Sequence, residues 1–270
     1  MAQLRDTGDL AKFQVVVVDD GSIDGTAEAV QRNYPEVTLL YGDGNLWWAG
    51  AIALGMQYAL EQQAEYIFWL NDDCLPQGNC LSKMLEFLQQ QHMAIVGARC
   101  LEKSSKEPIP TGLKNRWAVT TCSEEVMAVQ GLSGYLVGMT ANITQRLGLP
   151  DPQKFPQYGG DAIYTLQASR AKIGIYILGE AIALVSGKPA QSLRNFYHQQ
   201  TNKSWRQMFA TPKSPYYLRM RYFYYTSKYT LVLGAIIWMM HIVYWHLLWL
   251  WWQCKARLVY ISSAFKTNAS

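Results

Sequence analysis

Four consecutive valines at residues 15–18 form the first strong pattern along the chain. A run without polar alternation is typical of a strand buried on both faces, as in the parallel sheet of an α/β protein. Asp19 and Asp20 follow at its carboxyl end, which is the edge where open α/β sheets bind ligands. Two adjacent carboxylates there suit hydroxyls, a base N–H or a metal ion. The alternative is structural, with Asp20 and Ser22 shaping the turn and Asp24 capping the next helix.

Downstream, helical and extended patterns alternate, which predicts a parallel sheet with crossover helices. Helices are expected over 25–34, 49–63, 81–88, 144–147 and 162–172, and strands over 37–41, 66–70, 94–98 and 175–178. Residues 101–125 are polar, contain prolines and are expected to form a loop. Gly131, Gly134 and Gly138 stand among apolar residues in the strand or loop 126–139. They predict a cleft where the backbone approaches a ligand closely.

A second apolar segment, residues 229–254, holds 26 residues without a formal charge and is long enough to cross a bilayer as a helix. It contains five tryptophans and is interrupted by His241 and His246, so it suits a membrane interface as readily as a hydrocarbon core. The alternative, a packed helix of a soluble dimer, would not usually carry tryptophans around its circumference. We therefore predict membrane association through a helix that either spans the bilayer or lies flat.

The formal net charge of +4 is the sum of two unlike parts. Residues 1–180 hold 13 Lys and Arg and all 20 Asp and Glu, whereas residues 181–270 hold 11 Lys and Arg and no acidic residue. A basic stretch beside an apolar helix indicates a surface for anionic lipid headgroups. Nucleic acid is not an expected partner, because its binding proteins more often carry basic residues throughout the folded domain.

The cysteines and the N-terminus indicate the cellular compartment of the protein. Five cysteines, with neither zinc-ligand nor CxxC spacing, indicate reduced thiols in a cytosolic compartment. The first 14 residues contain no apolar stretch of the kind found in signal peptides, so none is expected. The catalytic domain is therefore predicted on the cytoplasmic side of the membrane.

Asn71, Asp72 and Asp73 follow the predicted strand 66–70 and bring several hard oxygen ligands to one point. Mg²⁺ or Mn²⁺ is typically held by one or two carboxylates together with substrate phosphates, which a nucleotide diphosphate would supply. The alternative is a strand-to-helix turn in which Asp72 or Asp73 serves as a cap.

Asp161 begins a predicted helix directly after Gly159 and Gly160. Its structural interpretation is a plain N-cap. Its functional interpretation is a general base held near a sugar hydroxyl.

Five blocks in this order resemble family 2 of the inverting nucleotide-sugar glycosyltransferases, which have the GT-A fold. The blocks are VVVVDDGSIDGT (15–26), GDGNLWWAGAIALGMQYAL (42–60), YIFWLNDDCLP (66–76), GLSGYLVG (131–138) and LPDPQKFPQYGGDAIYTLQASRAKIGIYIL (149–178). Residues 214–229 also resemble the tail of the rhamnosyltransferase-like branch, which acts on cell-surface polysaccharides and lipid-linked glycans.

The resemblance implies a donor site. Asp19 and Asp20 match carboxylates that contact the donor's base and ribose. Asn71, Asp72 and Asp73 occupy the family's DxD position, with Asp73 as the metal ligand and Asp72 on ribose or phosphate.

The resemblance also implies the chemistry. Asp161 matches the catalytic aspartate that deprotonates the acceptor hydroxyl. That hydroxyl then attacks the anomeric carbon in line as the metal-bound diphosphate leaves, with inversion. Trp47 and Trp48 are expected either to stack on the sugar or base or to pack between helix and sheet.

Two departures from the family pattern stand out. Asn71 stands where many members have Asp, which weakens the expected metal site by one charge. The family also places a strand of the type VVIPTYN and a helix before the DDGS strand, whereas 14 residues precede it here. We expect an N-terminally truncated domain with unpaired strand edges, poor solubility and weak or no activity.

The sequence thus predicts an α/β protein of the GT-A fold, a mostly parallel sheet flanked by helices, over residues 1–185. A basic connecting segment at 186–228, the membrane helix at 229–254 and a basic tail at 255–270 follow. The expected function is transfer of a sugar from a nucleotide-diphosphate donor to a cell-surface polysaccharide or lipid-linked glycan, and 101–125 and 187–213 are expected to face the acceptor. The alternative is a catalytically impaired membrane-associated remnant or a non-catalytic partner of an intact enzyme. A third alternative, an NAD-type dinucleotide site, is disfavoured because no GxGxxG follows the first strand.

Overall fold

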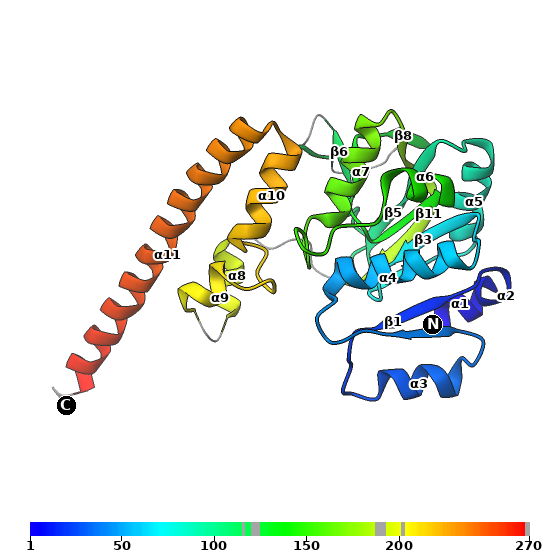
Figure 1. The fold of residues 1–270 in the computed structure, drawn as a ribbon. Helices are drawn as coiled ribbons and strands as arrows, with labels where there is room; N and C mark the ends of the chain where they lie inside the picture. Colours follow the sequence, from blue (N-terminus) through cyan, green and yellow to red (C-terminus); the bar gives the residue numbers. More distant parts are fainter. Residues whose placement is uncertain (115–116, 120–124, 187–192, 201–202, 268–270) are drawn as a thin grey trace. The chain divides into compact units, whose positions relative to one another are not determined.

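The computed structural model describes residues 1–114, 117–119, 125–186, 193–200 and 203–267, and describes side chains as far as residue 256 except for 117–119. The chain divides into two compact units, Met1–Ala190 and Gln191–Ser270. Each unit is described by itself (Figure 1).

Unit 1 is built around a six-stranded sheet. Its strands run in the order β3 (Tyr66–Leu70), β10 (Leu136–Thr140), β5 (Ala94–Glu102), β11 (Gly174–Val185) and β4 (Cys74–Pro76), with β8 (Val126–Ala128) also paired to β11. β5 and β11 are parallel, whereas β10 is antiparallel to both β3 and β5. The sheet is therefore mixed rather than mostly parallel. A central antiparallel strand buried on both faces, as β10 is, has the same continuous apolar pattern as a parallel one, so the sequence did not reveal its direction.

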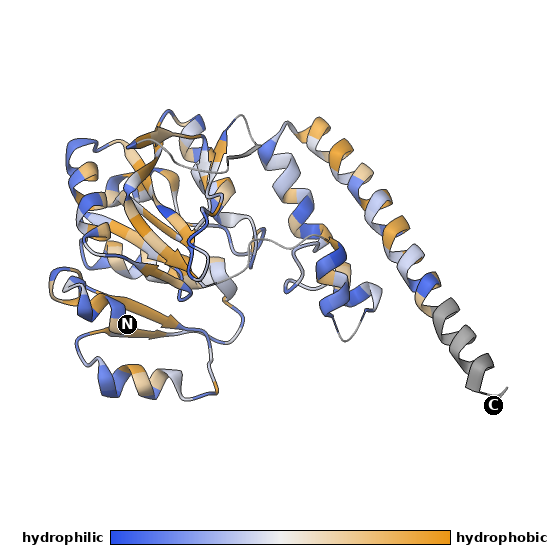
Figure 2. Ribbon diagram, turned by 180° about the vertical axis from the view of Figure 1, so that it is seen from behind, coloured by the Kyte–Doolittle hydropathy of each residue, from blue (hydrophilic) through white to orange (hydrophobic). Residues whose placement is uncertain are grey.

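Helices cover both faces of this sheet. On one face, Leu81, Met84 and Leu88 of α5 (Cys80–Gln90) pack with Val96, together with residues of α1 (Ala2–Asp6) and α2 (Asp9–Lys12). On the other face, Ile95 packs with α4 (Trp47–Glu61), α6 (Ala141–Leu147) and α7 (Gly160–Arg170). The neighbours Ile95 and Val96 thus serve opposite cores, as the period of two in a strand requires. Figure 2 shows the apolar strands between these helices.

The valine run forms β1 (Val16–Asp19) in a separate parallel pair with β2 (Thr38–Tyr41), connected by α3 (Thr26–Asn33). Its three valines are half-buried, so the prediction of a strand buried on both faces was wrong. The reason is its environment. Among the described residues β1 pairs with β2 alone, and the helix packed on it is α4, where Val18 lies opposite Gly55.

Other differences lie in the second half of unit 1. The expected loop 101–125 contains β6 (Gly112–Lys114) and β7 (Trp117–Val119). β6 is the middle strand of a small sheet and pairs with β7 on one side and with β9 (Gly131–Leu132) on the other, while residues 115–116 and 120–124 lie outside the description. β11 continues seven residues beyond the predicted strand 175–178. A register shift between Leu178 and Ile182 lets its pairing with β5 continue to Val185.

Unit 2 consists of helices α8 (Leu193–Gln199), α9 (Trp205–Phe209), α10 (Leu218–Lys228) and α11 (Leu231–Thr267). Aromatic side chains of α11, Trp245 and Trp252 among them, form a core with Phe196, Tyr197 and Phe209. Within the described residues, Leu231–Ala256 is the one helical stretch long and apolar enough to cross a membrane (Figure 2).

Candidate active site

The predicted site residues meet around the start of α4. Asp20 accepts hydrogen bonds from the backbone N–H groups of Gly44, at 2.9 Å to Oδ1, and of Trp47, at 2.9 Å to Oδ2. Both carboxylate oxygens therefore hold the loop that leads into α4, which corresponds to the structural role considered for this residue. Asp19 is buried, and its Oδ1 accepts a hydrogen bond from the N–H of Ser22.

Trp48 connects this loop to the end of β3. Its indole Nε1 donates a hydrogen bond to Asn71 Oδ1 at 2.8 Å, and its backbone N–H donates to Gln157 Oε1 at 3.1 Å. The ring also packs edge-on against Trp69, with centroids 5.8 Å apart. Trp48 is thus held in place on three sides, and the Asn71 oxygen that was expected to be free for a ligand is engaged.

Gly134 lies between Trp48 and Asp161. Its N–H donates a hydrogen bond of 2.6 Å to Asp161 Oδ2. A Cβ added at Gly134 would lie 2.5 Å from Trp48 Cζ2 and 3.0 Å from Asp161 Cβ, so no larger residue fits without displacing one of them. The close approach expected at this glycine is made by protein side chains. The same holds at Gly131, approached by Leu113, and at Gly138, approached by Phe68.

Asp161 lies in the first turn of α7, whose N-cap is Gly159 rather than Asp161. Its second oxygen, Oδ1, accepts a hydrogen bond from its neighbour Ala162 at 2.7 Å. Burial raises the pKa of Asp161 above its ordinary value, and the N–H groups of Gly134 and Ala162 partly counter that rise. A carboxyl group with a raised pKa in a desolvated position has the properties of a general base.

Asp72 is exposed, whereas Asp73 is half-buried beside it. Asp73 Oδ1 is buried and has no hydrogen-bond partner among the described residues. Burial, and then the like charge of Asp72, raise the pKa of Asp73. A buried carboxylate oxygen without a partner fits a cation, and the second carboxylate beside it adds charge for one.

The described residues bring together no group of three or more His, Cys, Asp or Glu side chains that could hold a metal ion by themselves. An ion at Asp72 and Asp73 would therefore take its remaining oxygen ligands from water and from the phosphates of a substrate.

Tyr135 is a member of the site that sequence reasoning missed. Its carbonyl oxygen accepts a hydrogen bond from the N–H of Asn71, and its neighbour Gly134 binds Asp161. Burial, followed by the charges of Asp73, Cys100 and Asp161, raises the pKa of Tyr135 to about 12. Tyr135 directly follows Gly134 in the block 131–138, and that position was the one available signal.

This arrangement of sheet, helices and acidic residues is the GT-A fold of nucleotide-sugar glycosyltransferases. Similar solved structures include GalNAc-T7 with UDP, GalNAc and Mn²⁺, at a TM-score of 0.53 and 12% identity over 79% of this chain and 44% of the other. A second is the mannosyltransferase PcManGT from Pyrobaculum calidifontis with GDP-Man and Mn²⁺, at a TM-score of 0.51 and 15% identity over 87% of this chain and 70% of the other. A third is S. aureus TarS 1-349, at a TM-score of 0.55 and 12% identity over 84% of this chain and 76% of the other. The chain thus spans less than half the length of GalNAc-T7.

The family model described as glycosyl transferase family 2 matches residues 2–140, and the chain belongs to that family. No curated protein is significantly similar to it in sequence.

Proposed function

We propose that this protein transfers a sugar from a nucleotide-diphosphate donor to a hydroxyl group of a cell-surface polysaccharide or lipid-linked glycan, with inversion at the anomeric carbon. The observation that supports it most is the contact chain through Trp48, which connects Asn71 at the end of β3 to Asp161 at the start of α7. Family membership supports glycosyl transfer itself.

Asp161 serves as the general base in this proposal. It accepts the proton of the acceptor hydroxyl, whose oxygen forms the new bond to the anomeric carbon as the bond to the diphosphate breaks. The N–H groups of Gly134 and Ala162 orient the two carboxylate oxygens. They also keep the charged form accessible despite burial, which a base requires.

Asp73, with Asp72 beside it, is proposed to hold Mg²⁺ or Mn²⁺. The partnerless Oδ1 of Asp73 supports this assignment, as does the Mn²⁺ in two similarly folded structures that contain nucleotide ligands. When bound, such an ion offsets the negative charge that develops on the leaving diphosphate.

The remaining donor contacts are assigned to Asp19, Asp20, Asn71 and Trp48. Trp48 fixes the Asn71 amide through Oδ1, which leaves the NH₂ group and the second lone pair of Oδ1 to contact the donor. Asp20 acts mainly through the loop that it holds, since both its oxygens accept backbone hydrogen bonds.

The acceptor and the location complete the proposal. A glycan attached to a membrane lipid would lie close to an enzyme held at the membrane by α11, with its transferase unit on the cytoplasmic side. The apolar stretch Leu231–Ala256 and the absence of acidic residues from 181–270 support membrane attachment.

The direct test is donor turnover by the full chain with Mn²⁺, compared with Asp161→Asn. Release of nucleoside diphosphate by the parent chain and its loss in the variant would support the assignment, and equal release by both would refute Asp161 as the base. A thermal-shift screen with UDP-, GDP- and dTDP-sugars identifies the donor beforehand.

The second candidate is a non-catalytic partner of an intact glycosyltransferase. It is favoured by the engagement of Asp20 and Asn71 in protein contacts and by β1, which pairs with β2 alone among the described strands. It predicts that neither donor hydrolysis nor transfer is detected, even with a nucleotide sugar that shifts the melting temperature.

A further inference from the structure

The two sides of α11 differ sharply within unit 2. One side is apolar and exposed, and its residues recur at intervals of three and four along more than four turns, which places them on a single face. We call this face the exposed stripe. It consists of Val232, Ile236, Met239, Met240, Val243, Leu247, Leu250 and Trp251, each between 45% and 70% exposed.

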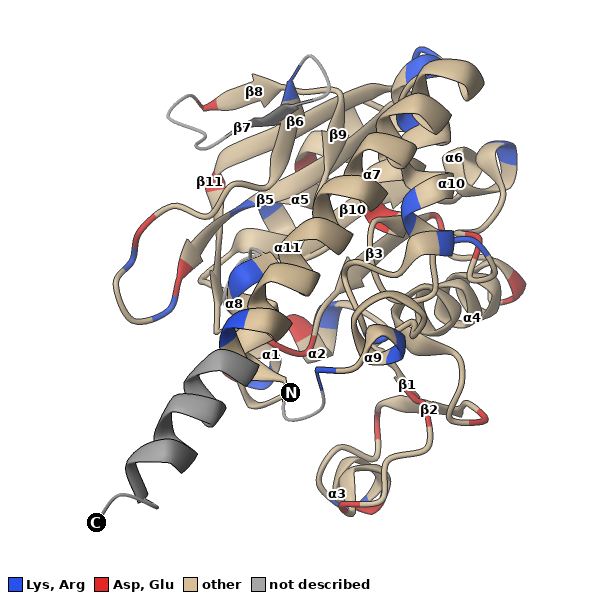
Figure 3. Cartoon of the chain, turned by 90° about the vertical axis from the view of Figure 1, so that its left-hand side faces the viewer, with Lys and Arg blue, Asp and Glu red and all other residues tan. Residues whose placement is uncertain are grey.

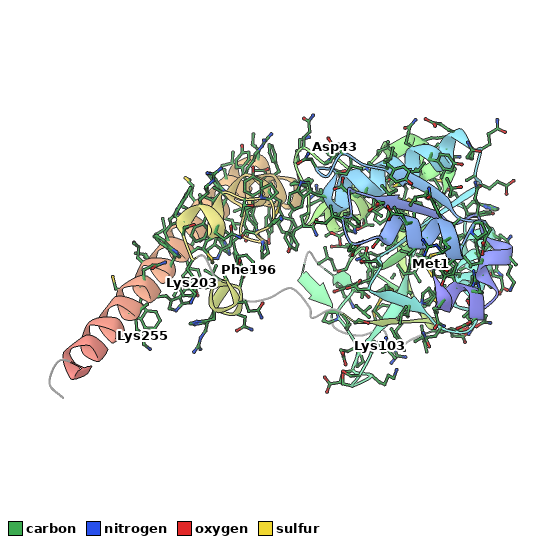
Figure 4. All side chains as sticks on the ribbon, turned by 90° about the horizontal axis from the view of Figure 1, so that it is seen from below. Met1, Asp43, Lys103, Phe196, Lys203 and Lys255 are labelled. Carbon is green, nitrogen blue, oxygen red and sulfur yellow. The ribbon has the colours of Figure 1, made fainter. Side chains whose placement is uncertain are left out.

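The opposite side of α11 is covered along the same length by the three shorter helices. Near its start, Gly234 lies so close to α10 that an added Cβ would meet the carbonyl oxygen of Tyr225 at 2.5 Å. Farther along, the indole of Trp238 donates to the carbonyl oxygen of Leu218 at 2.9 Å. Near the far end, the indole of Trp249 donates to the carbonyl oxygen of Lys203 at 2.9 Å. Figure 4 marks Lys203 close to α11.

These covering helices are basic and carry no acidic residue. Arg194, Arg206 and Arg219 are exposed. Arg221 is half-buried, with its guanidinium carbon 5.5–5.7 Å from the ring centroids of Tyr216, Tyr224 and Trp245. Figure 3 shows the Lys and Arg positions on α8, α9 and α10.

We propose that α11 is an in-plane anchor. It lies in the headgroup region of a bilayer containing anionic lipid, inserts the exposed stripe among the acyl chains and does not cross the membrane. The arginines of α8, α9 and α10 then lie at headgroup level, where phosphate groups attract them. Lys255, whose ammonium lies 5.5 Å from the ring centroid of Trp251, marks the end of the stripe with a further positive charge.

Length alone would allow α11 to span, since 26 helical residues extend roughly 39 Å. The packing argues otherwise. Helices α8, α9 and α10 contact α11 from Gly234 to Gln253, so a spanning α11 would carry Arg194, Arg206 and Arg219 into the hydrocarbon layer. Charged side chains at that depth are strongly disfavoured. An exposed apolar face on one side and arginine-bearing helices on the other together give the amphipathic pattern of a segment lying in the interface.

The proposal rests on the membrane attachment proposed above, but its tests do not require catalysis. The first test places a thiol at each end of α11, with Leu231→Cys at the start and the native Cys254 at the other end, both exposed. Right-side-out and inside-out vesicles from cells expressing the full chain are treated with a membrane-impermeant maleimide. Mass spectrometry of the peptides then reads each thiol separately.

An in-plane helix presents both thiols on one side, so both react in the same vesicle orientation and to a similar extent. Reaction of one thiol only in right-side-out vesicles and of the other only in inside-out vesicles would show a spanning helix and overturn the proposal.

The second test measures flotation of the purified full chain with vesicles of phosphatidylglycerol and phosphatidylcholine. The double variant Met240→Glu, Leu247→Glu should bind at least about tenfold less, because it places two carboxylates in the exposed stripe. The matched control is Ile23→Glu, at a fully exposed apolar position in unit 1, and it should bind as the parent does. Fluorescence of the buried Trp245 and Trp252 checks that unit 2 stays folded.

Equal binding by the parent and the double variant would overturn the proposal. So would a dimer seen by light scattering in lipid-free buffer, if the double variant dissociates it and the parent does not float with vesicles. In that case the exposed stripe is an interface between two copies.

Discussion

The indole of Trp48 donates its hydrogen bond to the side-chain oxygen of Asn71, two residues separated by 23 positions in the sequence and joined at 2.8 Å. This bond fixes the orientation of the Asn71 amide and leaves its NH₂ group and the second lone pair of its oxygen for other contacts. The same indole ring packs against the position of Gly134, whose N–H holds Asp161. Trp48 therefore connects the proposed donor-binding residue Asn71 to the proposed base Asp161.

Replacing Trp48 with Phe removes the indole N–H that donates to Asn71 while keeping an aromatic ring. We expect the free energy of unfolding to fall by about 0.5–1.5 kcal/mol, the net value of one hydrogen bond. The freed Asn71 amide should rotate, so the KM for the donor should rise severalfold while the expected pH profile of Asp161 is retained. Steady-state kinetics with varied donor concentration checks this. Unchanged KM in a folded variant would mean that Asn71 does not contact the donor.

Asp161→Asn removes the proposed base. We expect kcat to fall by about 10²–10⁴, the usual contribution of general base catalysis, with donor affinity unchanged by calorimetry. The pH dependence of the parent enzyme is a second check. Asp161 acts only when deprotonated, and burial raises its pKa. Activity should therefore fall as the pH drops through that raised pKa, at a pH above the ordinary range for Asp, and level off above it.

Asp73→Asn separates metal binding from stability. Asp73 has a buried oxygen without a partner and the like charge of Asp72 beside it, so its carboxylate destabilises the metal-free protein. The neutral amide should raise the unfolding free energy by roughly 0.5–2 kcal/mol without metal, the range common for stabilising substitutions that cost function. It should also abolish stabilisation by Mn²⁺, measured by thermal denaturation with and without the ion. Asp43→Asn, at an exposed position, is the control and should leave both values unchanged, because an amide oxygen can still accept the hydrogen bond from the N–H of Asn45.

Gly134→Ala should disturb the site by steric crowding alone. The added methyl would press on Trp48 and Asp161, and overpacking of this kind costs about 1–3 kcal/mol. Activity should fall more than tenfold, because the base is displaced. Gly55→Ala is the matched control. Gly55 lies inside α4, and an added Cβ would make only an ordinary contact of 3.5 Å with Val18 of β1. That change should stabilise the protein by up to about 1 kcal/mol through helix propensity. Equal denaturation midpoints for the two variants would contradict the close packing at Gly134.

Sequence patterns predicted helices and strands well where interactions between residues close in the sequence decide the structure. The helical spacing of Ile52, Met56 and Leu60 predicted α4, and the apolar run 66–70 predicted β3. Patterns could not give the direction of β10, because hydrophobicity along a buried strand does not depend on direction. The sequence patterns also predicted that a ligand approaches Gly134, whereas in the structure the side chain of Trp48 packs against that glycine. That contact depends on how α4 and α7 meet over the sheet, which no sequence period encodes.

The acidic site residues could be found because they follow strands, but what their oxygens contact could not. Asp20 and Asp73 look alike in sequence, each the last acidic residue of a pair after an apolar run. In the structure, both oxygens of Asp20 accept backbone hydrogen bonds, whereas one oxygen of Asp73 is buried without a partner. The difference arises from the loop 42–47, which folds back on Asp20.

The pairing of β11 sets the order of events during synthesis. β11 joins β5, β4 and β8, so the main sheet cannot close until Val185 has been made. Synthesis at 5–20 residues per second takes roughly 2–9 s to pass from Val185 to Leu231, where α11 begins. Domains generally fold as units, and N-terminal domains fold first during synthesis. We therefore expect the transferase unit to acquire its sheet while α11 is still being synthesised, so that it folds in solution before the chain can bind a membrane.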